Sequence, residues 1–521
     1  MGISGLALAG ITGCSQYRPN GSALPFSPLE PMNADEFMLA KGFNYKILVS
    51  EQADLGNGLK FGCNNDFISY LPIKNRAYEG YLWVNHEYYT RLFVTGFNSR
   101  YSDLKPTKKQ VDHELYQVGG SILHVKKNKS GHWEYLKGSA KNQRITGHTQ
   151  IPLIADRPIV NSTVAMGTLA NCAGGQTPWG TFLTCEENYD NFYGEVEFKN
   201  GQRQMKSPTA QDASWRQYYN NPPEHYGWVV EVDPVNKTQK KLTALGRFAH
   251  ESATVHSLPD GRVVVYSGDD KANECIYKFI SDRPNSLDQG ELFVANTEKG
   301  EWVSLSWKKN LLLQKNFKDQ TEVLIRCREA AKLVGGTPQD RPEDIEIHPE
   351  TGHVYVTLTN NKAKGNFHGS IVKFEPQNND HASDRYTFKT FLAGGEENGF
   401  SCPDNLAFDR KGNLWMACDI SPNALGKAPY NSFKNNSLFY IPMSGSDAGR
   451  VFRVASGPVE SELTGLCFAP DGESLFLSVQ HPGEASKDMN SLTSHWPMGG
   501  NATPQSSVVC IQGPALKKLL S

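Results

Sequence analysis

The stretch RPEDIEIHPETGHVYVTLTNN, residues 341–361, has the pattern of two short β-strands joined by a tight turn. Apolar and polar residues alternate on both sides of the turn at Gly352, as expected for a hairpin with one buried face. Arg341 and two carboxylates, Glu343 and Asp344, stand at the start of the first strand. The alternation predicts β-structure, and the charged start needs a separate explanation.

The same strand–turn–strand pattern recurs along the chain. Residues 251–270, 404–419 and 462–481 are close copies, and residues 67–87 and 168–188 are looser ones. Aligned on their glycines, the copies lie 60 to 100 residues apart, at Gly80, Gly180, Gly261, Gly352, Gly412 and Gly472.

Six strand pairs at these intervals predict an all-β fold, a six-bladed β-propeller with inserted loops and a few short helices. Seven or eight blades remain possible if weaker copies exist, whereas two β domains are disfavoured because the repeats leave no linker. A helix is expected at 320–336, which ends in glycine, and 189–224 is interpreted as a long surface insertion. Each copy would supply the two inner strands of a blade, with outer strands at 227–234, 276–280, 370–376 and 438–442.

Composition excludes several classes of protein. The 521 residues include 53 basic and 55 acidic side chains, and no basic run indicates a nucleic-acid partner. No segment reaches the roughly 18 apolar residues of a membrane span. The ten cysteines lack CxxC spacing and define no disulfide framework.

The N-terminal residues resemble an export signal. GISGLALAGITGC is a short apolar stretch, and its last four residues, 11–14, resemble a lipoprotein processing box, although a positively charged start is missing. We therefore expect residues 1–20 to be the remnant of an export signal and residues 21–521 to form a single β-propeller catalytic domain. The expected location is periplasmic or extracellular.

Polar residues mark the same point of every predicted blade. In a propeller the first strand begins, and the second ends, on one face near the axis. The first strands begin at Asp66, Asn171, Glu251, Glu343, Asp404 and Glu462. The second strands end at Glu87, Cys185 to Asn188, Asp269, Asp270, Asn360, Asn361, Asp419 and His481.

A ring of carboxylates predicts a metal site. A single acid at such a position is typical of a solvated turn, but recurrence in every blade is not. Crowded carboxylates repel one another, and multivalent cations relieve that repulsion. Cys185 ends its strand beside polar residues, where a thiolate suits iron or zinc, whereas carboxylates suit calcium. Other cysteines are expected to be small buried apolar residues: Cys172, Cys275, Cys418 and Cys467.

Arg341 allows two interpretations. Its guanidinium could pair with Glu343 or Asp344, or it could bind a phosphate bidentately beside the cations. The second reading predicts phosphoryl chemistry, with a metal-activated water or oxide as the nucleophile. The chain lacks GxSxG, Walker A and HExxH motifs, which weakens the serine-hydrolase, nucleotide-hydrolase and zincin alternatives.

Long motifs throughout the repeat region match one known family. They are NCAGGQTPWGTFLTCEEN (171–188), YGWVVEVDP (226–234), GRFAHESA (246–253), YSGDD (266–270), ECIYKF (274–279), RPEDIEIHP (341–349), PDNLAFD (403–409), GNLW (412–415) and VQHPGE (479–484). These resemble the PhoX alkaline phosphatases from about residue 61 to 485. The resemblance implies a six-bladed propeller, twin-arginine export, phosphate-monoester hydrolysis, and a site with an oxo-bridged Fe(III) pair and Ca²⁺.

The resemblance also implies roles for individual residues. It makes Cys185 an iron ligand, Glu251, Glu343 and Asp404 metal ligands, and Arg341 a phosphate contact. A second set holds calcium or braces the site: Glu462, Glu87, Asn171 and Glu274. The chain departs from the family in showing no twin-arginine pair and in having a shorter insertion between residues 188 and 226.

Three functions remain open at this stage. The leading hypothesis is an exported, monomeric, metal-dependent phosphatase acting on small-molecule phosphate esters. A calcium-dependent propeller lactonase would need the acid ring but neither the thiolate nor Arg341. A non-catalytic binding propeller would use calcium only structurally.

Overall fold

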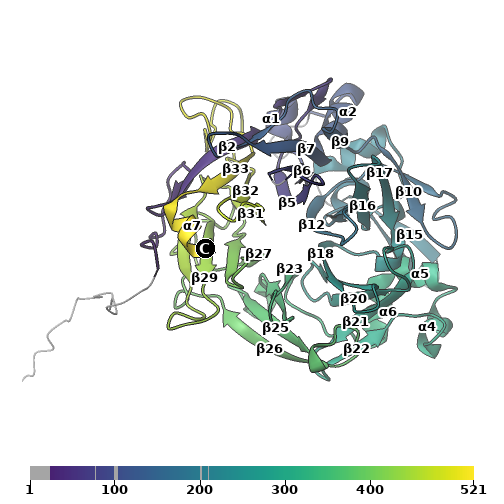
Figure 1. Ribbon diagram of the computed structural model, residues 1–521. Coiled ribbons are helices and arrows are strands. Elements are labelled where there is room, and N and C mark those ends of the chain that lie inside the picture. The colour runs from purple at the N-terminus through teal and green to yellow at the C-terminus, as the bar shows by residue number, and fades with distance from the viewer. Residues whose placement is uncertain (1–23, 77, 99–103, 200–201, 209–210) are drawn as a thin grey trace, which may run out of the picture.

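The computed structural model describes residues 24–76, 78–98, 104–199, 202–208 and 211–521. The expected export segment, residues 1–20, lies outside the described residues. Within them, six sheets of four or more strands form a ring, and their inner strands surround a central axis (Figure 1). The predicted six-bladed propeller is therefore confirmed.

The first three blades contain residues 65 to 304. Blade one consists of β5 (Asn65–Pro72), β6 (Glu79–His86), β7 (Gly119–Lys127), β8 (Trp133–Tyr135) and β9 (Gln143–Ile145). Blade two consists of β12 (Asn171–Gln176), β13 (Phe182–Glu186), β16 (Val229–Asp233), β17 (Thr238–Leu242), β10 (Gln150–Ile154) and β11 (Val164–Met166). Blade three consists of β18 (His250–Ser257), β19 (Val263–Asp269), β20 (Ile276–Ser281), β21 (Gly290–Asn296) and β22 (Glu301–Ser304).

The last three blades include strands from both ends of the chain. Blade four consists of β23 (Pro342–Ile347), β24 (Val354–Leu358), β25 (Ser370–Pro376) and β26 (Tyr386–Ala393). Blade five consists of β27 (Pro403–Phe408), β28 (Leu414–Cys418), β29 (Ser437–Ile441), β30 (Phe452–Ser456) and β1 (Met38–Leu39). Blade six consists of β31 (Glu462–Phe468), β32 (Leu475–Gln480), β33 (Ser507–Gln512) and β2 (Asn44–Ser50).

Short helices and hairpins connect the blades. The α-helices are α1 (Arg91–Thr95), α2 (Lys108–Gln117), α3 (Asp190–Tyr193), α4 (Leu311–Asn316), α5 (Gln320–Ile325), α6 (Cys327–Leu333) and α7 (Pro514–Leu520). The 3₁₀ turns are η1 (Gln211–Gln217), η2 (Pro223–His225), η3 (Thr243–Leu245), η4 (Lys362–Lys364) and η5 (Gln377–Asn379). Two hairpins pair β3 (Asp54–Gly56) with β4 (Leu59–Lys60) and β14 (Glu195–Lys199) with β15 (Gln202–Lys206).

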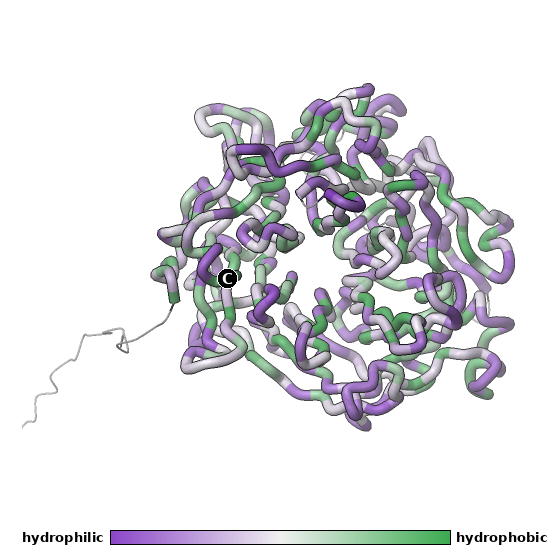
Figure 2. Tube along the Cα trace, viewed as in Figure 1, coloured by the Kyte–Doolittle hydropathy of each residue, from purple (hydrophilic) through white to green (hydrophobic). Residues whose placement is uncertain are grey.

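Strand β2 closes the ring. It comes from the N-terminal part of the chain and pairs antiparallel with β33 near the C-terminus, as the outermost strand of blade six. Apolar side chains pack between neighbouring sheets, as in the cluster that joins β2 to blades one and six. Hydrophobic segments are accordingly distributed all around the ring (Figure 2).

The predicted strand pairs are the inner two strands of the six blades, and the predicted outer strands are β16, β20, β25 and β29. Five of the aligned glycines have positive φ angles, as a tight turn requires. Gly80 was wrongly placed in a turn. It lies within β6 opposite Pro72, where a Cβ atom would come within 2.5 Å of the Tyr70 ring.

Two other local predictions need correction. The helix expected at 320–336 is divided into α5 and α6, because Arg326 has non-helical dihedral angles between them. The insertion at 189–224 is not plain loop, since it contains α3, the β14–β15 hairpin, η1 and η2. The buried Trp215 of this insertion packs against Tyr89 and Phe192.

Burying a charge in β2 should destabilise the ring. Val49 is 3% exposed, so Val49→Asp should lower the free energy of unfolding by about 3 kcal/mol. Ile47 lies in the same strand but is 40% exposed, and Ile47→Asp should cost about 1 kcal/mol or less. Thermal unfolding followed by circular dichroism compares the two variants. Equal losses would show that closure by β2 does not limit stability.

Candidate active site

A β-bulge interrupts the first strand of every blade near its start. The pairing shifts register between Asn65 and Ile68 in β5, and at the corresponding places of β12, β18, β23, β27 and β31. A bulge places two residues opposite one and redirects their side chains. The bulged positions include Asp66, Cys172, Ser252, Glu343 and Asp404.

Strained backbone accompanies these bulges. Ala170, Arg341 and Cys402 each precede the first residue of an inner strand and have φ angles of 53°, 57° and 52°. Side chains other than glycine adopt this region at a cost. The packing of the surrounding blades must offset this cost. It thereby fixes the backbone conformation just before each of these strands.

Three groups of possible metal ligands lie at the axis. In each group, one ligand atom from every member lies within 4.8 Å of the others. Cys172 belongs to two of them, so its thiol connects blades one, two and three. The groups are Asp66 with Glu87 and Cys172, Cys172 with Glu187 and Glu251, and Asp404 with Asp419 and Glu462.

Crowding changes the acidity of the first two groups. Burial, followed by the nearby carboxylates beginning with Glu343, raises the pKa of Glu251 well above 4.5. Within the described part of the chain, neither carboxylate oxygen of Glu251 has a hydrogen-bond partner. Burial, and then the charge of Asp66, raises the pKa of Glu87 to about 8, while burial raises the pKa of Asp66 to about 6. These residues fit cations, which would stabilise the ionised forms.

The third group is equally crowded. Burial, and then Glu462, raises the pKa of Asp404 well above 3.8. Burial, and then Asp419, does the same for the pKa of Glu462 above 4.5. His481 Nε2 lies 3.5 Å from a carboxylate oxygen of Glu462. This all-oxygen group resembles the ligand sets that calcium prefers.

Arg341 connects blade three to blade four. Its Nε and Nη2 donate to the two carboxylate oxygens of Asp270 at 2.8 and 2.9 Å, and Nη2 also donates to Glu343 at 2.7 Å. The ion pair with Glu343 was one of the two sequence readings, whereas Asp270 was not named as a partner. The side chain is 27% exposed, and Nη1 makes no hydrogen bond to the described residues.

Asp344 does not join the axial groups. Its carboxylate accepts hydrogen bonds from the backbone N–H of Ile345 and Leu406, at 2.8 and 2.7 Å, and from the hydroxyl of Ser252. These partners come from blades three, four and five. Asp344 therefore bridges neighbouring blades.

Cys185 is not placed with the acids. It is fully buried in an apolar cluster with Leu183 and Val229, because residues two apart share one face of β13. The thiol of Cys172 in β12, rather than that of Cys185, lies among the carboxylates. The strand alternation carries no signal for the bulge that redirects Cys172.

The four residues predicted to hold calcium or brace the site lie in different surroundings. Glu87 and Glu462 lie in the ligand groups. Glu274 pairs instead with Lys332 of α6 at 2.6 Å, outside those groups. Asn171 Nδ2 donates to hydroxyl oxygens of Thr168 and Thr184 at 2.8 and 2.9 Å, a bracing arrangement. Sequence reasoning located Asp66, Glu187, Asp270 and Asp419 at the axis but assigned them no role.

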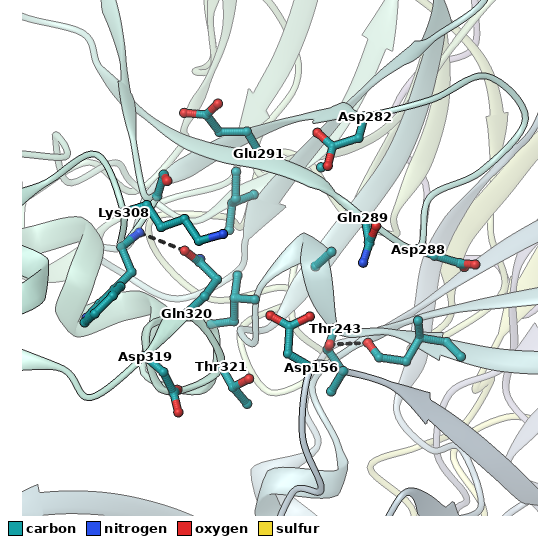
Figure 3. A pocket seen from close by; sticks show the side chains of 18 of the residues that line it. Asp156, Thr243, Asp282, Asp288, Gln289, Glu291, Lys308, Asp319, Gln320 and Thr321 are labelled. Carbon is teal, nitrogen blue, oxygen red and sulfur yellow. Dashed lines mark hydrogen bonds between the residues drawn. The ribbon is translucent and has the colours of Figure 1, made fainter.

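A cleft of about 970 Å³ lies outside this site (Figure 3). It separates the outer strands of blades two and three, and helix α5 forms one wall. None of the axial acids lines it. The side chains labelled in Figure 3 are all polar or charged, among them Asp156, Asp282 and Lys308.

Comparison with known proteins identifies the family. A family model described as alkaline phosphatase PhoX matches residues 24–483. The chain belongs to the alkaline phosphatase PhoX family. It superposes on Pseudomonas fluorescens PhoX in complex with vanadate, a transition state analogue, with a TM-score of 0.83. The identity is 30%, over 95% of this chain and 98% of that one. As a PhoX protein, the chain is a metal-dependent phosphatase that hydrolyses phosphate monoesters.

Other solved structures share only low sequence identity with the chain. A protein of unknown function from Dyadobacter fermentans is 9% identical, with a TM-score of 0.40, over 91% of this chain and 100% of that chain. The gluconolactonase XC5397 from Xanthomonas campestris is 10% identical, with a TM-score of 0.34, over 96% and 99%. At these values neither bears on function. No curated protein matches the sequence.

Alanine substitutions should distinguish the two cysteines. Cys172→Ala removes a member of two ligand groups and should lower turnover of p-nitrophenyl phosphate about 100-fold or more. Cys185→Ala removes only core packing, so turnover should stay within about twofold, with about 1 kcal/mol of stability lost. Elemental analysis of both variants supplies a second measurement. Loss of metal from the Cys185 variant alone would reverse the assignment.

Proposed function

We propose that the axial groups bind iron and calcium, and that Arg341 binds the phosphate of the substrate. The observation that carries this proposal is the convergence of buried ligands in which Glu251 has no protein partner among the described residues. Cys172 gives its two groups a soft donor, which favours iron, and the third group offers only oxygen, which favours calcium. The assignment to an Fe(III) pair with Ca²⁺ follows the family resemblance.

Arg341 is arranged to receive a phosphate. Asp270 and Glu343 are buried and hold two sides of its guanidinium, so its orientation is set before a substrate arrives. The Nη1 donors are available for phosphoryl oxygens. Because guanidinium stays protonated at alkaline pH, the contact would persist there.

The cations complete the chemistry that these residues prepare. When bound, they would neutralise developing charge on the phosphoryl oxygens and activate the attacking oxygen. A phosphate monoester carries negative charge and would be repelled by the carboxylate ring alone. The proposed site therefore needs its cations for substrate binding as well as for catalysis.

We further propose that the protein is a monomer exported to the periplasm or beyond the cell, by the twin-arginine route or with a lipid anchor. The apolar segment ending in residues 11–14 supports export. Among the described residues, no helix has the length and apolar character to cross a membrane.

Substitution of Arg341 tests the phosphate contact. Arg341→Ala should lower kcat/KM for p-nitrophenyl phosphate about 10²- to 10³-fold and weaken inhibition by vanadate, because a donor to the transition state is lost. Bound metal should remain. Arg328→Ala is the matched control, since Arg328 pairs bidentately with the neighbouring Asp269 but belongs to no ligand group. Unchanged vanadate inhibition in the Arg341 variant would exclude the contact.

Metal removal tests the cation assignment. Protein purified without added metal should contain both iron and calcium by elemental analysis. EGTA should abolish phosphatase activity, and Ca²⁺, but not the smaller Mg²⁺, should restore it, because Mg²⁺ demands a tighter octahedral set of ligands. Full activity in protein depleted of both metals would contradict the proposal.

A further inference from the structure

Gln480, the last residue of β32, joins two carboxylates of the neighbouring blade. Its side chain is fully buried. Nε2 donates to Oδ2 of Asp66 and to Oε2 of Glu87, each at 3.0 Å. A single amide of blade six therefore holds together two members of one ligand group in blade one.

The amide suits this position better than a charged group. Once a cation keeps both carboxylates ionised, they accept hydrogen bonds but cannot donate them, so the NH₂ side of Gln480 must face them. Lysine or arginine would supply positive charge and compete with a cation for the same oxygens. Glutamine supplies donors and leaves the negative charge in place.

Other groups of blade six orient Asp66 in the same way. The Thr464 hydroxyl donates to its Oδ1, and the Ser478 hydroxyl donates to its backbone carbonyl at 2.7 Å. Cys172 Sγ, the third member of the group, lies 3.2 Å from Oδ2. The position of Asp66 is thus fixed by neighbours on both sides.

The arrangement leaves one buried polar atom unpaired. Both N–H donors of Gln480 are used, and Oε1 has no hydrogen-bond partner among the described residues. An unpaired buried carbonyl is destabilising. A residue chosen for stability alone would not leave it so, and this favours a role in the site.

We propose that Gln480 is a positioning residue, whose amide fixes Asp66 and Glu87 side by side so that, with Cys172, they form one cation site. This inference rests on the proposed function, because it concerns the same axial ligands. Gln480 is not itself a member of any ligand group. The proposal therefore adds a residue of blade six on which the group of Asp66, Glu87 and Cys172 depends.

Metal retention tests the role directly. Purified wild type, Gln480→Leu and Gln512→Leu are dialysed against increasing EGTA, and the retained calcium and iron are measured by mass spectrometry. The EGTA concentration that removes half of the metal should fall about tenfold for Gln480→Leu. Gln512 is the matched control in the same blade, where its amide donates to Gly131 and Ser474, and its variant should retain metal like wild type.

Gln480→Glu provides a second variant of the same shape. This variant replaces the donors with a third carboxylate, which adds to the repulsion between Asp66 and Glu87. Its Tm should drop in EGTA and recover in excess calcium. The difference between these two Tm values should be larger than in wild type. An amide with only a structural role would shift the two Tm values equally. That result, or wild-type metal retention in Gln480→Leu, would overturn this inference alone. A wild-type protein without bound metal would overturn the proposed site together with it.

Discussion

Repulsion among buried carboxylates at the axis is the constraint on which the rest of the structure depends. Glu251 has neighbouring acids from several blades and no protein partner among the described residues. In water such groups would separate, but here they lie at the ends of inner strands, and the first strand of each blade packs against the first strands of its two neighbours. The propeller thus imposes a charge density that the chain's own cations do not neutralise. The molecule acquires its affinity for metal by maintaining this unfavourable arrangement.

The blades resist that repulsion through their backbones. Side chains on the second strand of one blade donate to carbonyl groups on the first strand of the next. Asn85 reaches the carbonyl of Cys172, and Thr357 reaches that of Asp404, each at 2.7 Å. These bonds attach to the very residues whose side chains are candidate ligands, while leaving those side chains free. The backbone atoms of these residues are held by the neighbouring blade, and their side-chain atoms are not used in these bonds.

The sequence predicts those features that depend on local pattern. Alternation and turn glycines are local, so the blades were predicted, and the geometry of a propeller then located Glu343 near the axis. The position of Cys172 among the carboxylates could not be predicted, because a bulge changes which face a residue occupies without changing the alternation around it. The pairing of Arg341 with Asp270 spans 71 positions and two blades, so only the folded ring defines it.

Charge balance determines the order in which this site can work. The acids of the three groups, together with Asp270 and Glu343, outnumber the positive charge of Arg341, and that charge is already shared between two carboxylates. A phosphate ester approaching the site without metals would meet net negative potential in a low-dielectric environment, where repulsion is strong. At the proposed site, binding of cations would therefore precede binding of substrate. The same cations would draw Asp270 and Glu343 partly away from Arg341, which would free guanidinium donors for the phosphate. With the proposed phosphate contact of Arg341, metal loading and phosphate affinity would then be coupled through this arginine.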